Sequence, residues 1–545
     1  MRRVIAGAST AVLVGALVSL AGPARPAGAA TLSVPSAAYR TISAAIAAAH
    51  NGDTVAVARG TYRENITIVG KRITVRSVSG PSVTVIAGNP GRTPVMIQNI
   101  PAGTMTLQGF RIVSGSAPSG QGGAITIANY ASPTIRGNEL VANRSNDGAG
   151  ILVYNQSNPT IVGNNIHGNI AARFGGGVFA VIGSSPKVSG NTITGNRAYG
   201  GGGIYLEDDV THPTYRSAPS VVGNTITNNV ASQAGGGVML RTGVNALIGK
   251  NTITGNSAPY GGGIHIETTG SSPRITGNVI TGNSALTSAA WPGSGSGGGI
   301  AVFGHSRPTI SHNSIIGNRT TRFGGGIVLA EGSVSMVNAN NIARNTVIST
   351  GSGPGGGGIY LANSEATIQN NALRQNSAPL GGGVAFVGTG SLVLVNNTIV
   401  SNASRAGSAA SGGGLFVSNH SSGKASIVNN VFTANNNFQI FEMGAFATYS
   451  NNLITNSGNG MFYSFPAHII TDIRNFNGNP HIRYAVGNIG SSPAFVNAPA
   501  FDYRLTRGSP AVDAARSAGA PSTDIWGAHR PYGIRPDIGA FEFTG

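Results

Sequence analysis

The sequence contains no cysteine among its 545 residues. Disulfide bonds and thiolate metal sites are therefore excluded, and stability has to come from packing. Charged residues make up only 9% of the chain, whereas ordinary globular domains contain about a quarter. Beyond residue 30, no apolar run is long enough to span a bilayer. Neither a recognition helix nor a dense stripe of lysine and arginine is visible, so the sequence does not indicate a nucleic-acid partner.

The first 30 residues have the three parts of a secretion signal. Arg2 and Arg3 are followed by an apolar run over residues 12–20 and by small residues over 27–30. We therefore predict a signal peptide over residues 1–30 and a mature protein that is secreted or associated with the cell envelope. The arginine pair leaves the export route open between the general and the twin-arginine pathways.

Glycine and basic residues are what the chain has in excess. It contains 83 glycines, and 34 lysines and arginines against 17 acidic residues give a net charge of +17. An excess of positive charge favours encounters with polyanions such as acidic polysaccharides, although it also keeps a secreted protein soluble. Repeated tight turns around a continuous apolar core would explain so much glycine in a chain with 40% hydrophobic residues.

One phrase recurs along the chain, as in SPTIRGNELVAN, SPKVSGNTITGN and SPRITGNVITGN. A second asparagine follows the first one five residues later in every repeat but the last. Repeats of this length mark solenoids, in which one repeat cannot bury its own apolar face. The first asparagine of the phrase falls at positions 138, 164, 191, 224, 251, 278, 313, 340, 371, 397, 430 and 452.

Each repeat contains three short segments of alternating β-branched and polar residues, so we predict an all-β, right-handed parallel β-helix with three strands per coil. Rows of isoleucine and valine fill its interior. Stacked asparagine amides hydrogen-bond along the axis at corners where they also tolerate left-handed backbone angles, and triple glycines form an unobstructed corner.

The two ends of the solenoid have their own sequence patterns. A short amphipathic helix with Ile42, Ala45, Ile46 and Ala49 on one face is expected to cap the N-terminal end. The β-helix is predicted over residues 31–475, with this cap from about residue 39. Residues 476–545 lack the asparagine phrase and are predicted to close the other end. We expect a monomer.

These residues resemble the pectate-lyase-like right-handed β-helix superfamily of secreted proteins. GDTVAVARGTYREN is similar to the family's first coil, and DYRLTRGSPAVDA with RPDIGAFEF is similar to the closing segment of exported bacterial β-helix proteins of the choice-of-anchor-Q type. The resemblance runs from about Tyr39 to the C-terminus and implies the β-helix fold. Members include polysaccharide lyases, galacturonases, pectin esterases, uronan epimerases and adhesins, so the fold alone selects no activity.

The enzyme motifs of that superfamily match only in part. GTYRE, which ends at Glu64, is similar to a pectin esterase opening, and the adjacent acids Asp208 and Asp209 match a pair in the galacturonases. The other catalytic blocks of both families are missing, and so is the arginine-proline-arginine block of the pectate lyases.

One polar window stands out on the strand that follows each glycine cluster. Every second residue of that strand is expected to point outward, which gives two exposed rows. Glu207, Arg241 and Glu267 lie on three adjacent coils of one row, and Tyr205 and His265 belong to the other. Enlarged loops over residues 207–218 and 284–296 are expected to form walls around this window. The predicted catalytic residues are Glu207, Asp208, Asp209, Arg241, His265 and Glu267, and the predicted substrate-binding residues are Tyr205, Trp291, Phe303 and His305.

The window is compatible with several kinds of chemistry. Glu207 and Glu267, two coils or about 9.6 Å apart, could act as acid and base on a glycosidic bond. Arg241 could instead neutralise a uronate carboxylate while His265 or a nearby base removes the acidified proton, which gives β-elimination. Asp208, Asp209 and Glu207 could hold calcium. Alternatively, Arg241 simply pairs with its two glutamate neighbours at the surface.

The sequence thus predicts a secreted protein that engages an extracellular, acidic polysaccharide as a lyase or a hydrolase. The rival interpretation is a non-catalytic envelope or adhesion protein, whose solenoid serves as a rigid binding face or spacer.

Overall fold

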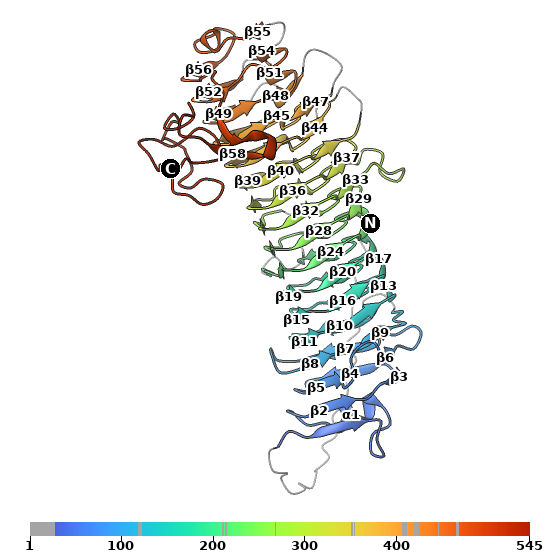
Figure 1. Cartoon of the computed structure of the whole chain (residues 1–545). Helices are drawn as coiled ribbons and strands as arrows, with labels where there is room; N and C mark the ends of the chain where they lie inside the picture. The colour runs from blue at the N-terminus through green and yellow to red at the C-terminus, as the bar shows by residue number, and fades with distance from the viewer. Residues whose placement is uncertain are drawn as a thin grey trace.

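The computed structural model is a long, narrow column of stacked coils in which nearly all regular structure is β-strand (Figure 1). The predicted signal peptide lies outside the described residues except for positions 28–30. No helix in the part of the chain that the structure describes is long and apolar enough to cross a membrane. The described residues are 28–117, 122–209, 212, 215–267, 269–349, 353, 355–405, 411–418, 424–444, 446–464 and 468–545.

Sheet A contains two strands from most coils, and we call the two sets rows A1 and A2. The strands of row A1, most of which follow a glycine cluster, are β4 (Ile66–Val69), β7 (Val95–Gln98), β10 (Ile125–Ala128), β14 (Ile151–Val153), β18 (Val178–Ala180), β22 (Ile204–Glu207), β26 (Val238–Arg241), β30 (Ile264–Glu267), β34 (Ile300–Phe303), β38 (Ile327–Leu329), β42 (Ile359–Gln369), β45 (Val384–Val395), β48 (Gly412–Ser418), β51 (Phe438–Met443), β54 (Gly460–Ser464) and β55 (His468–Ile470).

Row A2 lies next along each coil, and the long strands β42 and β45 run through both rows. Its other strands are β1 (Thr31–Val34), β2 (Thr54–Val57), β5 (Thr74–Ser77), β8 (Thr106–Gln108), β11 (Thr134–Arg136), β15 (Thr160–Val162), β19 (Lys187–Ser189), β23 (Ser220–Val222), β27 (Leu247–Gly249), β31 (Arg274–Thr276), β35 (Thr309–Ser311), β39 (Val334–Asn338), β49 (Lys424–Val428), β52 (Ala447–Ser450) and β56 (Tyr484–Val486).

Sheet B forms the next face of the solenoid. Its strands are β3 (Gly60–Arg63), β6 (Thr84–Ala87), β9 (Arg111–Val113), β12 (Glu139–Val141), β16 (Asn165–His167), β20 (Thr192–Thr194), β24 (Thr225–Thr227), β28 (Thr252–Thr254), β32 (Val279–Thr281), β36 (Ser314–Ile316), β40 (Asn341–Ala343), β43 (Ala372–Arg374), β46 (Thr398–Val400), β50 (Val431–Thr433) and β53 (Leu453–Ile454).

Sheet C lies just before the glycine corner and adds a short fourth strand to coils in which the sequence predicts three. Its strands are β13 (Arg144–Asp147), β17 (Ile170–Phe174), β21 (Arg197–Gly200), β25 (Val230–Ala234), β29 (Ser257–Ala258), β33 (Ser284–Ala285), β37 (Arg319–Thr320), β41 (Thr346–Val347), β44 (Ser377–Ala378) and β47 (Ala403–Ser404).

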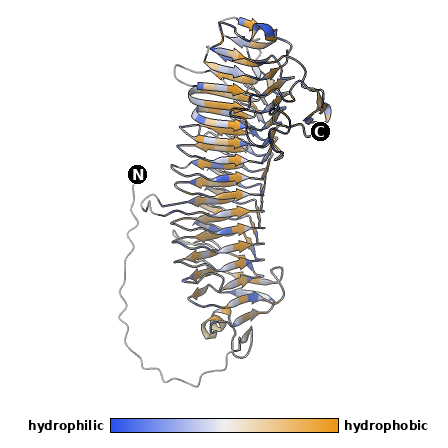
Figure 2. Cartoon of the chain, turned by 90° about the vertical axis from the view of Figure 1, so that its left-hand side faces the viewer, coloured by the Kyte–Doolittle hydropathy of each residue, from blue (hydrophilic) through white to orange (hydrophobic). Residues whose placement is uncertain are grey.

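Neighbouring coils pair in parallel and largely in register, which confirms the predicted β-helix. On sheet B, Ile193, Ile226 and Ile253 lie directly opposite one another, and each is fully buried. Val188 and Val221 stack in the same way on row A2. Stacking of equivalent residues produces one apolar core along the column, and Figure 2 shows hydrophobic strand residues at every level of it.

Two ladders of asparagine amides run along the axis, one on each side of sheet B. Asn251 illustrates the pattern: its Nδ2 donates to Asn278 Oδ1 at 3.0 Å and to the Val221 carbonyl at 2.8 Å, and its backbone N–H donates to the same Asn278 oxygen. The amides are fully or almost fully buried. The first ladder extends beyond the predicted repeats, because Asn452 donates to Asn488 and Asn488 to Asn477.

The left-handed backbone angle belongs to the residue before each ladder asparagine, not to that asparagine itself as the sequence analysis expects. Lys250 has φ 53° and Asn228 has φ 54°, whereas many equivalent residues are glycine, which adopts this conformation without strain. The ladder asparagines thus contribute their amides, and the preceding residues contribute the bend.

The glycine corner brings coils too close together for side chains. Gly235 has φ +67°, and a Cβ on the next glycine, Gly236, would lie 2.5 Å from the carbonyl oxygen of Gly262 in the following coil. Glycine is therefore required at this corner by the spacing of the coils as well as by backbone conformation.

The predicted N-terminal helix, α1 (Ile42–Ala48), covers the end of the core with Ile42, Ala45 and Ile46. Glu64 accepts hydrogen bonds from the N–H groups of Ile42 and Ser43, both at 2.9 Å, and the Lys71 ammonium donates to the last carbonyls of the helix. A carboxylate at the N-terminus and an ammonium at the C-terminus both complement the helix dipole. Glu64 is thus a helix cap, which explains the GTYRE pattern without catalysis.

The segment after Asn475 closes the C-terminal end only in part. It follows the short helix η1 (Ile473–Asn475), and its first residue, Phe476, packs on Tyr449 and Phe462 with ring centroids 5.4 and 5.1 Å apart. Residues from about 490 onward, including η2 (Ala498–Ala500), β57 (Phe495–Asn497) and β58 (Asp502–Leu505), lie against the side of the column (Figure 1). Their apolar side chains cover Ala372, Val400 and Val431 on the outer face of sheet B, so most of the segment is a lateral cover.

Asparagine doublets attach this lateral segment to the coils. Asn370, Asn396 and Asn429 each precede a ladder asparagine, at the left-handed position that is glycine in several earlier coils. Their Nδ2 groups donate to the carbonyls of Thr523, Asp537 and Arg516 at 2.7–2.8 Å. The repeated NN doublet is thus the sequence signal for the docking of the segment.

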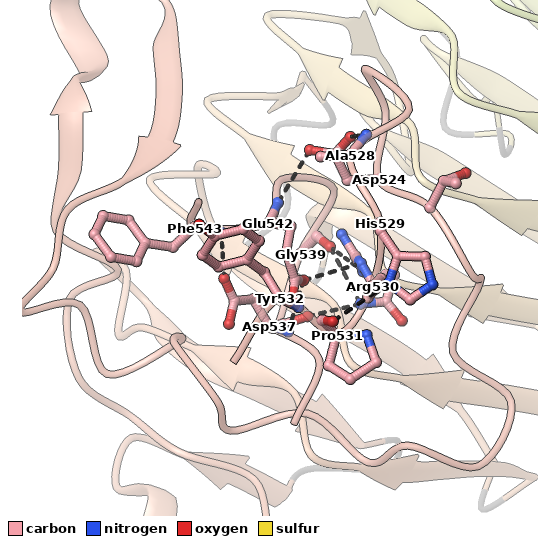
Figure 3. Close-up of polar contacts among 12 residues, drawn as sticks. Asp524, Ala528, His529, Arg530, Pro531, Tyr532, Asp537, Gly539, Glu542 and Phe543 are labelled. Atoms are coloured by element: carbon pink, nitrogen blue, oxygen red, sulfur yellow. Dashed lines mark hydrogen bonds and ion pairs between the residues drawn. The ribbon is translucent and has the colours of Figure 1, made fainter. Parts of the chain in front are cut away.

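A buried ion pair organises the interior of the segment (Figure 3). Arg530 Nε lies 3.1 Å from Glu542 Oε2, and both side chains are almost completely buried. Glu542 also accepts hydrogen bonds from the N–H groups of Tyr532 and Asp537. Burial raises the pKa of Asp537 to about 6. The RPDIGAFEF motif therefore serves to hold together the loops that cover sheet B.

Replacing one ladder asparagine should destabilise the column. Asn229 donates to Asn256 and to the Ile193 carbonyl, and it accepts from Asn196, all at 2.9–3.0 Å. We expect Asn229→Ala to lower the free energy of unfolding by at least about 2 kcal/mol, because buried polar groups on both neighbouring coils lose partners. Asn165→Ala, at an exposed position of β16, is the control and should change it by less than about 0.5 kcal/mol. Urea unfolding followed by circular dichroism measures both, and equal effects would contradict the role of the ladder.

Candidate functional site

Glu207, Arg241 and Glu267 lie side by side at the ends of β22, β26 and β30. The pairing of these strands places Glu207 opposite Arg241 and Arg241 opposite Glu267. Arg241 Nη1 is 3.8 Å from Glu207 Oε1, and the side-chain exposures are 18% for Glu207, 43% for Arg241 and 49% for Glu267. The predicted polar window is therefore present as a contiguous, outward-facing charged row.

The row next to it is buried, contrary to the expectation that both outward rows are exposed. Tyr205 is fully buried and His265 is 4% exposed. The reason is that sheet C and the glycine corner fold back over row A1, where Phe174 packs on Tyr205 with ring centroids 4.6 Å apart. Burial prevents Tyr205 from contacting a substrate, so its assignment as a substrate-binding residue is wrong.

Tyr205 nevertheless lies beneath the window, next to two of its charged residues. Its buried hydroxyl has no hydrogen-bond partner among the described residues, although the charges of Glu207 and Arg241 both act on it. Burial raises the pKa of Tyr205 well above its ordinary value. The residue is thus a neutral phenol at the base of the window.

The two glutamates have pKa values shifted in opposite directions. Burial raises the pKa of Glu207, although the Arg241 charge opposes this shift. For Glu267, the neighbouring His265 and the Arg241 charge hold the pKa below its ordinary value, and His265 Nε2 lies 3.6 Å from Glu267 Oε2. Glu207 therefore retains its proton to higher pH than Glu267 does.

A residue outside the sequence prediction contributes to this difference. Asp147 at the end of β13 forms an ion pair with Arg173 and is 5% exposed, and one of its carboxylate oxygens has no partner. Its negative charge further raises the pKa of Glu207. No sequence signal indicated Asp147, because sheet C brings it next to row A1 only in the folded chain.

Asp208 serves as an anchor for the loop that follows β22. Its carboxylate accepts hydrogen bonds from the N–H groups of Gly183, Asp209 and Ser217 and from the Ser217 hydroxyl, at 2.9–3.1 Å. Oxygens that face N–H donors are not available to a cation, so Asp208 does not fit the predicted calcium site or a catalytic role. Among the described residues, no group of three or more acidic or histidine side chains could hold a metal ion.

The described residues of the loop after Asp208 pack against preceding coils. Asp209 pairs with His212 at 2.7 Å, and the His212 ring stacks on Tyr215. Tyr215 in turn contacts Gly183 and accepts a hydrogen bond from Gln156 at 3.2 Å, on the two preceding coils. Asp209 is thus held by His212, although its negative charge also raises the pKa of Glu207. The predicted wall over residues 207–218 lies partly outside the described residues.

The predicted substrate-binding residues Trp291, Phe303 and His305 occupy different places. Trp291 reaches back to Tyr199, with ring centroids 6.5 Å apart, and so lies near β21, the strand that precedes the Glu207 strand. Phe303 is opposite Glu267 on the next strand, and its ring lies 5.5 Å from that of His265. His305 is exposed and packs near Gly332. Of the three, only Phe303 is paired directly with a residue of the charged row.

A pocket of about 150 Å³ opens beside Glu267. Tyr260, His265 and Phe303 line it together with Glu267, Gln233 and Glu331. No sequence signal indicated Gln233 or Glu331, because Gln233 lies in β25 and Glu331 follows β38, in different coils, and no repeat position links them. The exposed charged row and this pocket together form the candidate site.

Comparison with known families identifies the architecture. The sequence pattern of the right-handed β-helix region matches residues 102–280, 275–432 and 340–475. The chain belongs to this right-handed β-helix family. No curated protein sequence matches the chain.

Solved structures similar to this β-helix include three enzymes. Pectate lyase Pel9A is 14% identical and covers 94% of this chain and 96% of its own, with a TM-score of 0.26. The GH87 α-1,3-glucanase of Streptomyces thermodiastaticus strain HF3-3 is 13% identical, covers 74% and 69%, and has a TM-score of 0.36. Alginate lyase AlyF-OU02, solved in complex with G6, is 12% identical, covers 95% and 97%, and has a TM-score of 0.36. No conclusion about function follows from these similarities.

The loop-anchoring role of Asp208 predicts the effect of its removal. We expect Asp208→Ala to destabilise the loop by about 1–3 kcal/mol, because three N–H donors lose their acceptor, and to speed proteolytic cleavage between residues 209 and 216. Glu365→Ala, at an exposed position of β42, is the control and should leave cleavage unchanged. Millimolar calcium should protect neither the wild type nor the variants, and protection of the wild type alone would instead indicate a cation at Asp208.

Proposed function

We propose that this β-helix is exported and hydrolyses glycosidic bonds of an extracellular polysaccharide at the charged row. The observation that carries the proposal is the register of Glu207, Arg241 and Glu267, which lie on three adjacent strands and face the same side. Equivalent positions on a solenoid repeat about every 4.8 Å, so this face suits an extended polymer that lies along the axis. The signal-like residues 1–30 support export.

The two carboxyl groups have the properties that this chemistry needs. Glu207 and Glu267 are two strands apart, so their Cα atoms are separated by about 9.6 Å, and inverting glycosidases hold their carboxyl groups about 6.5–9.5 Å apart. Glu207, with its raised pKa, donates a proton to the leaving oxygen. Glu267, with its lowered pKa, is ionised and activates the attacking water. Opposite pKa shifts of neighbouring carboxyl groups are the usual way to assign an acid and a base.

A second candidate reaction is β-elimination on a uronate-containing polysaccharide. Two observations favour it: Arg241 is accessible at the centre of the row, and the whole chain carries a net charge of +17. Arg241 would bind the uronate carboxylate and Glu267 would remove the acidified proton. Glu267 is the better base of the two candidates, because His265 is largely buried and its Nε2 faces Glu267. The opposite pKa shifts of Glu207 and Glu267, which suit an acid and a base, favour hydrolysis over this alternative.

Substitution of either glutamate should abolish most hydrolysis without unfolding the protein. We expect Glu207→Gln and Glu267→Gln to lower the rate by about 100-fold or more, because each removes one proton-transfer group. The rate is measured as new reducing ends released from a panel of acidic and neutral polysaccharides, with and without calcium, while absorbance at short ultraviolet wavelengths detects unsaturated products.

The matched control for these substitutions is Glu365→Gln, at an exposed position of β42 outside the charged row. It should retain full activity, and all three variants should keep the wild-type circular dichroism spectrum. Release of unsaturated products would replace hydrolysis with elimination. Binding of a polysaccharide with no product of either kind would instead support a non-catalytic binding face.

The pH dependence should follow the two shifted pKa values. Hydrolysis requires a protonated Glu207 and an ionised Glu267, so the rate should fall as pH drops through the lowered pKa of Glu267 and also as it rises through the raised pKa of Glu207. Because the Arg241 charge lowers both pKa values, Arg241→Met should move both limbs of the profile to higher pH. An unmoved profile would contradict the assignment of these two groups.

A further inference from the structure

The pocket beside Glu267 has a composition that is unusual for this chain. Acidic residues number only 17 in 545, yet two of them, Glu267 and Glu331, line one pocket of about 150 Å³. Among the described residues, no lysine or arginine lines it. Arg241, the cation of the charged row, does not line the pocket and pairs with Glu207. The pocket is therefore locally negative within a strongly basic protein.

Aromatic rings form the rest of the pocket. Tyr260 and Phe303 meet edge to face, with ring centroids 5.9 Å apart and an interplanar angle of 87°. Both rings are only partly buried, so part of each faces the pocket. Aromatic faces attract cations, and carboxylates beside them strengthen this preference. A cationic group is thus better suited to this pocket than a neutral or an anionic one.

His265 supplies an independent indication that the pocket holds a ligand. The residue is 4% exposed and lines the pocket, and its Nδ1 atom is buried without a hydrogen-bond partner. An unpartnered polar atom of this kind is rare in a folded protein and calls for a physical reason. Its Nε2 is directed at Glu267, whose lowered pKa keeps the carboxylate ionised beside the pocket.

We propose that this pocket binds the protonated amine of an amino sugar, so that the polysaccharide engaged by the charged row carries free amino groups. This inference rests on the proposed hydrolytic function and specifies its substrate class. A sugar seated between Glu267 and Phe303 would extend along row A1 toward Glu207, in line with a polymer that follows the axis. The overall positive charge acts at long range, where salt screens it, whereas the two carboxylates act at contact distance.

Binding of defined oligosaccharides tests the inference. The full chain is titrated by calorimetry with β-1,4-linked hexamers of glucosamine, N-acetylglucosamine and galacturonate. We expect the glucosamine hexamer to bind at least about tenfold more tightly than the other two, because only its ammonium groups can pair with both carboxylates. Glu331→Gln should remove most of this preference, because it removes one of the two carboxylates that line the pocket.

The control is Glu365→Gln, which removes an exposed carboxylate that does not line this pocket and should keep the preference intact. Equal binding of the glucosamine and N-acetylglucosamine hexamers, or a preference that survives Glu331→Gln, would overturn the inference.

The same oligosaccharides separate this inference from the proposed hydrolysis. If the amine preference depends on Glu331 while Glu207→Gln leaves product release unchanged, the inference stands and the hydrolytic assignment fails. If hydrolysis requires Glu207 but shows no preference for amine-bearing hexamers, the hydrolytic assignment stands and the inference fails.

Discussion

The stacked asparagine amides are the interaction on which the rest of the structure depends. Each amide hydrogen-bonds to backbone groups of the preceding coil and to the equivalent amide of the next coil, out of contact with water. Because buried amides of this kind are costly to leave unpaired, they fix the register of every coil to its neighbours. A fixed register aligns the apolar rows inside, and it also aligns the outward residues from which a binding face is made.

The charged row follows directly from that alignment. Arg241 follows Glu207 by 34 residues and precedes Glu267 by 26 residues. The three meet only because their coils stack without a shift. The scarcity of charge elsewhere increases the effect of each group, since few other ions compensate a partly buried carboxylate. The opposite pKa shifts of Glu207 and Glu267 therefore arise from ordinary causes, namely burial for one and polar neighbours for the other.

Most differences between the sequence-based predictions and the structure concern what covers a strand. The alternation of apolar and polar residues shows which side chains point away from the core, but it does not show what lies above them. Tyr205 points outward and is nevertheless buried, because the preceding sheet C strands and glycine corner fold back over it. Asp208 looks like half of an acidic pair, but nearby N–H groups that are distant in sequence occupy its carboxylate. The lateral position of the last residues could have been predicted from the NN doublets at Asn370, Asn396 and Asn429, whose extra amides hold that segment.

The sequence by itself determined the parallel coils, the asparagine and glycine corners, the helical cap and the row that contains Glu207, Arg241 and Glu267. These features depend on local periodicity, which repeats along the chain and is visible without knowledge of any contact. Only the tertiary structure decided which outward residues are covered, that Asp147 acts on Glu207, and that Glu331 and Tyr260 meet beside Glu267 to form a pocket. These arrangements depend on loops and corners of irregular length, whose paths are set by packing against distant coils and not by the repeat.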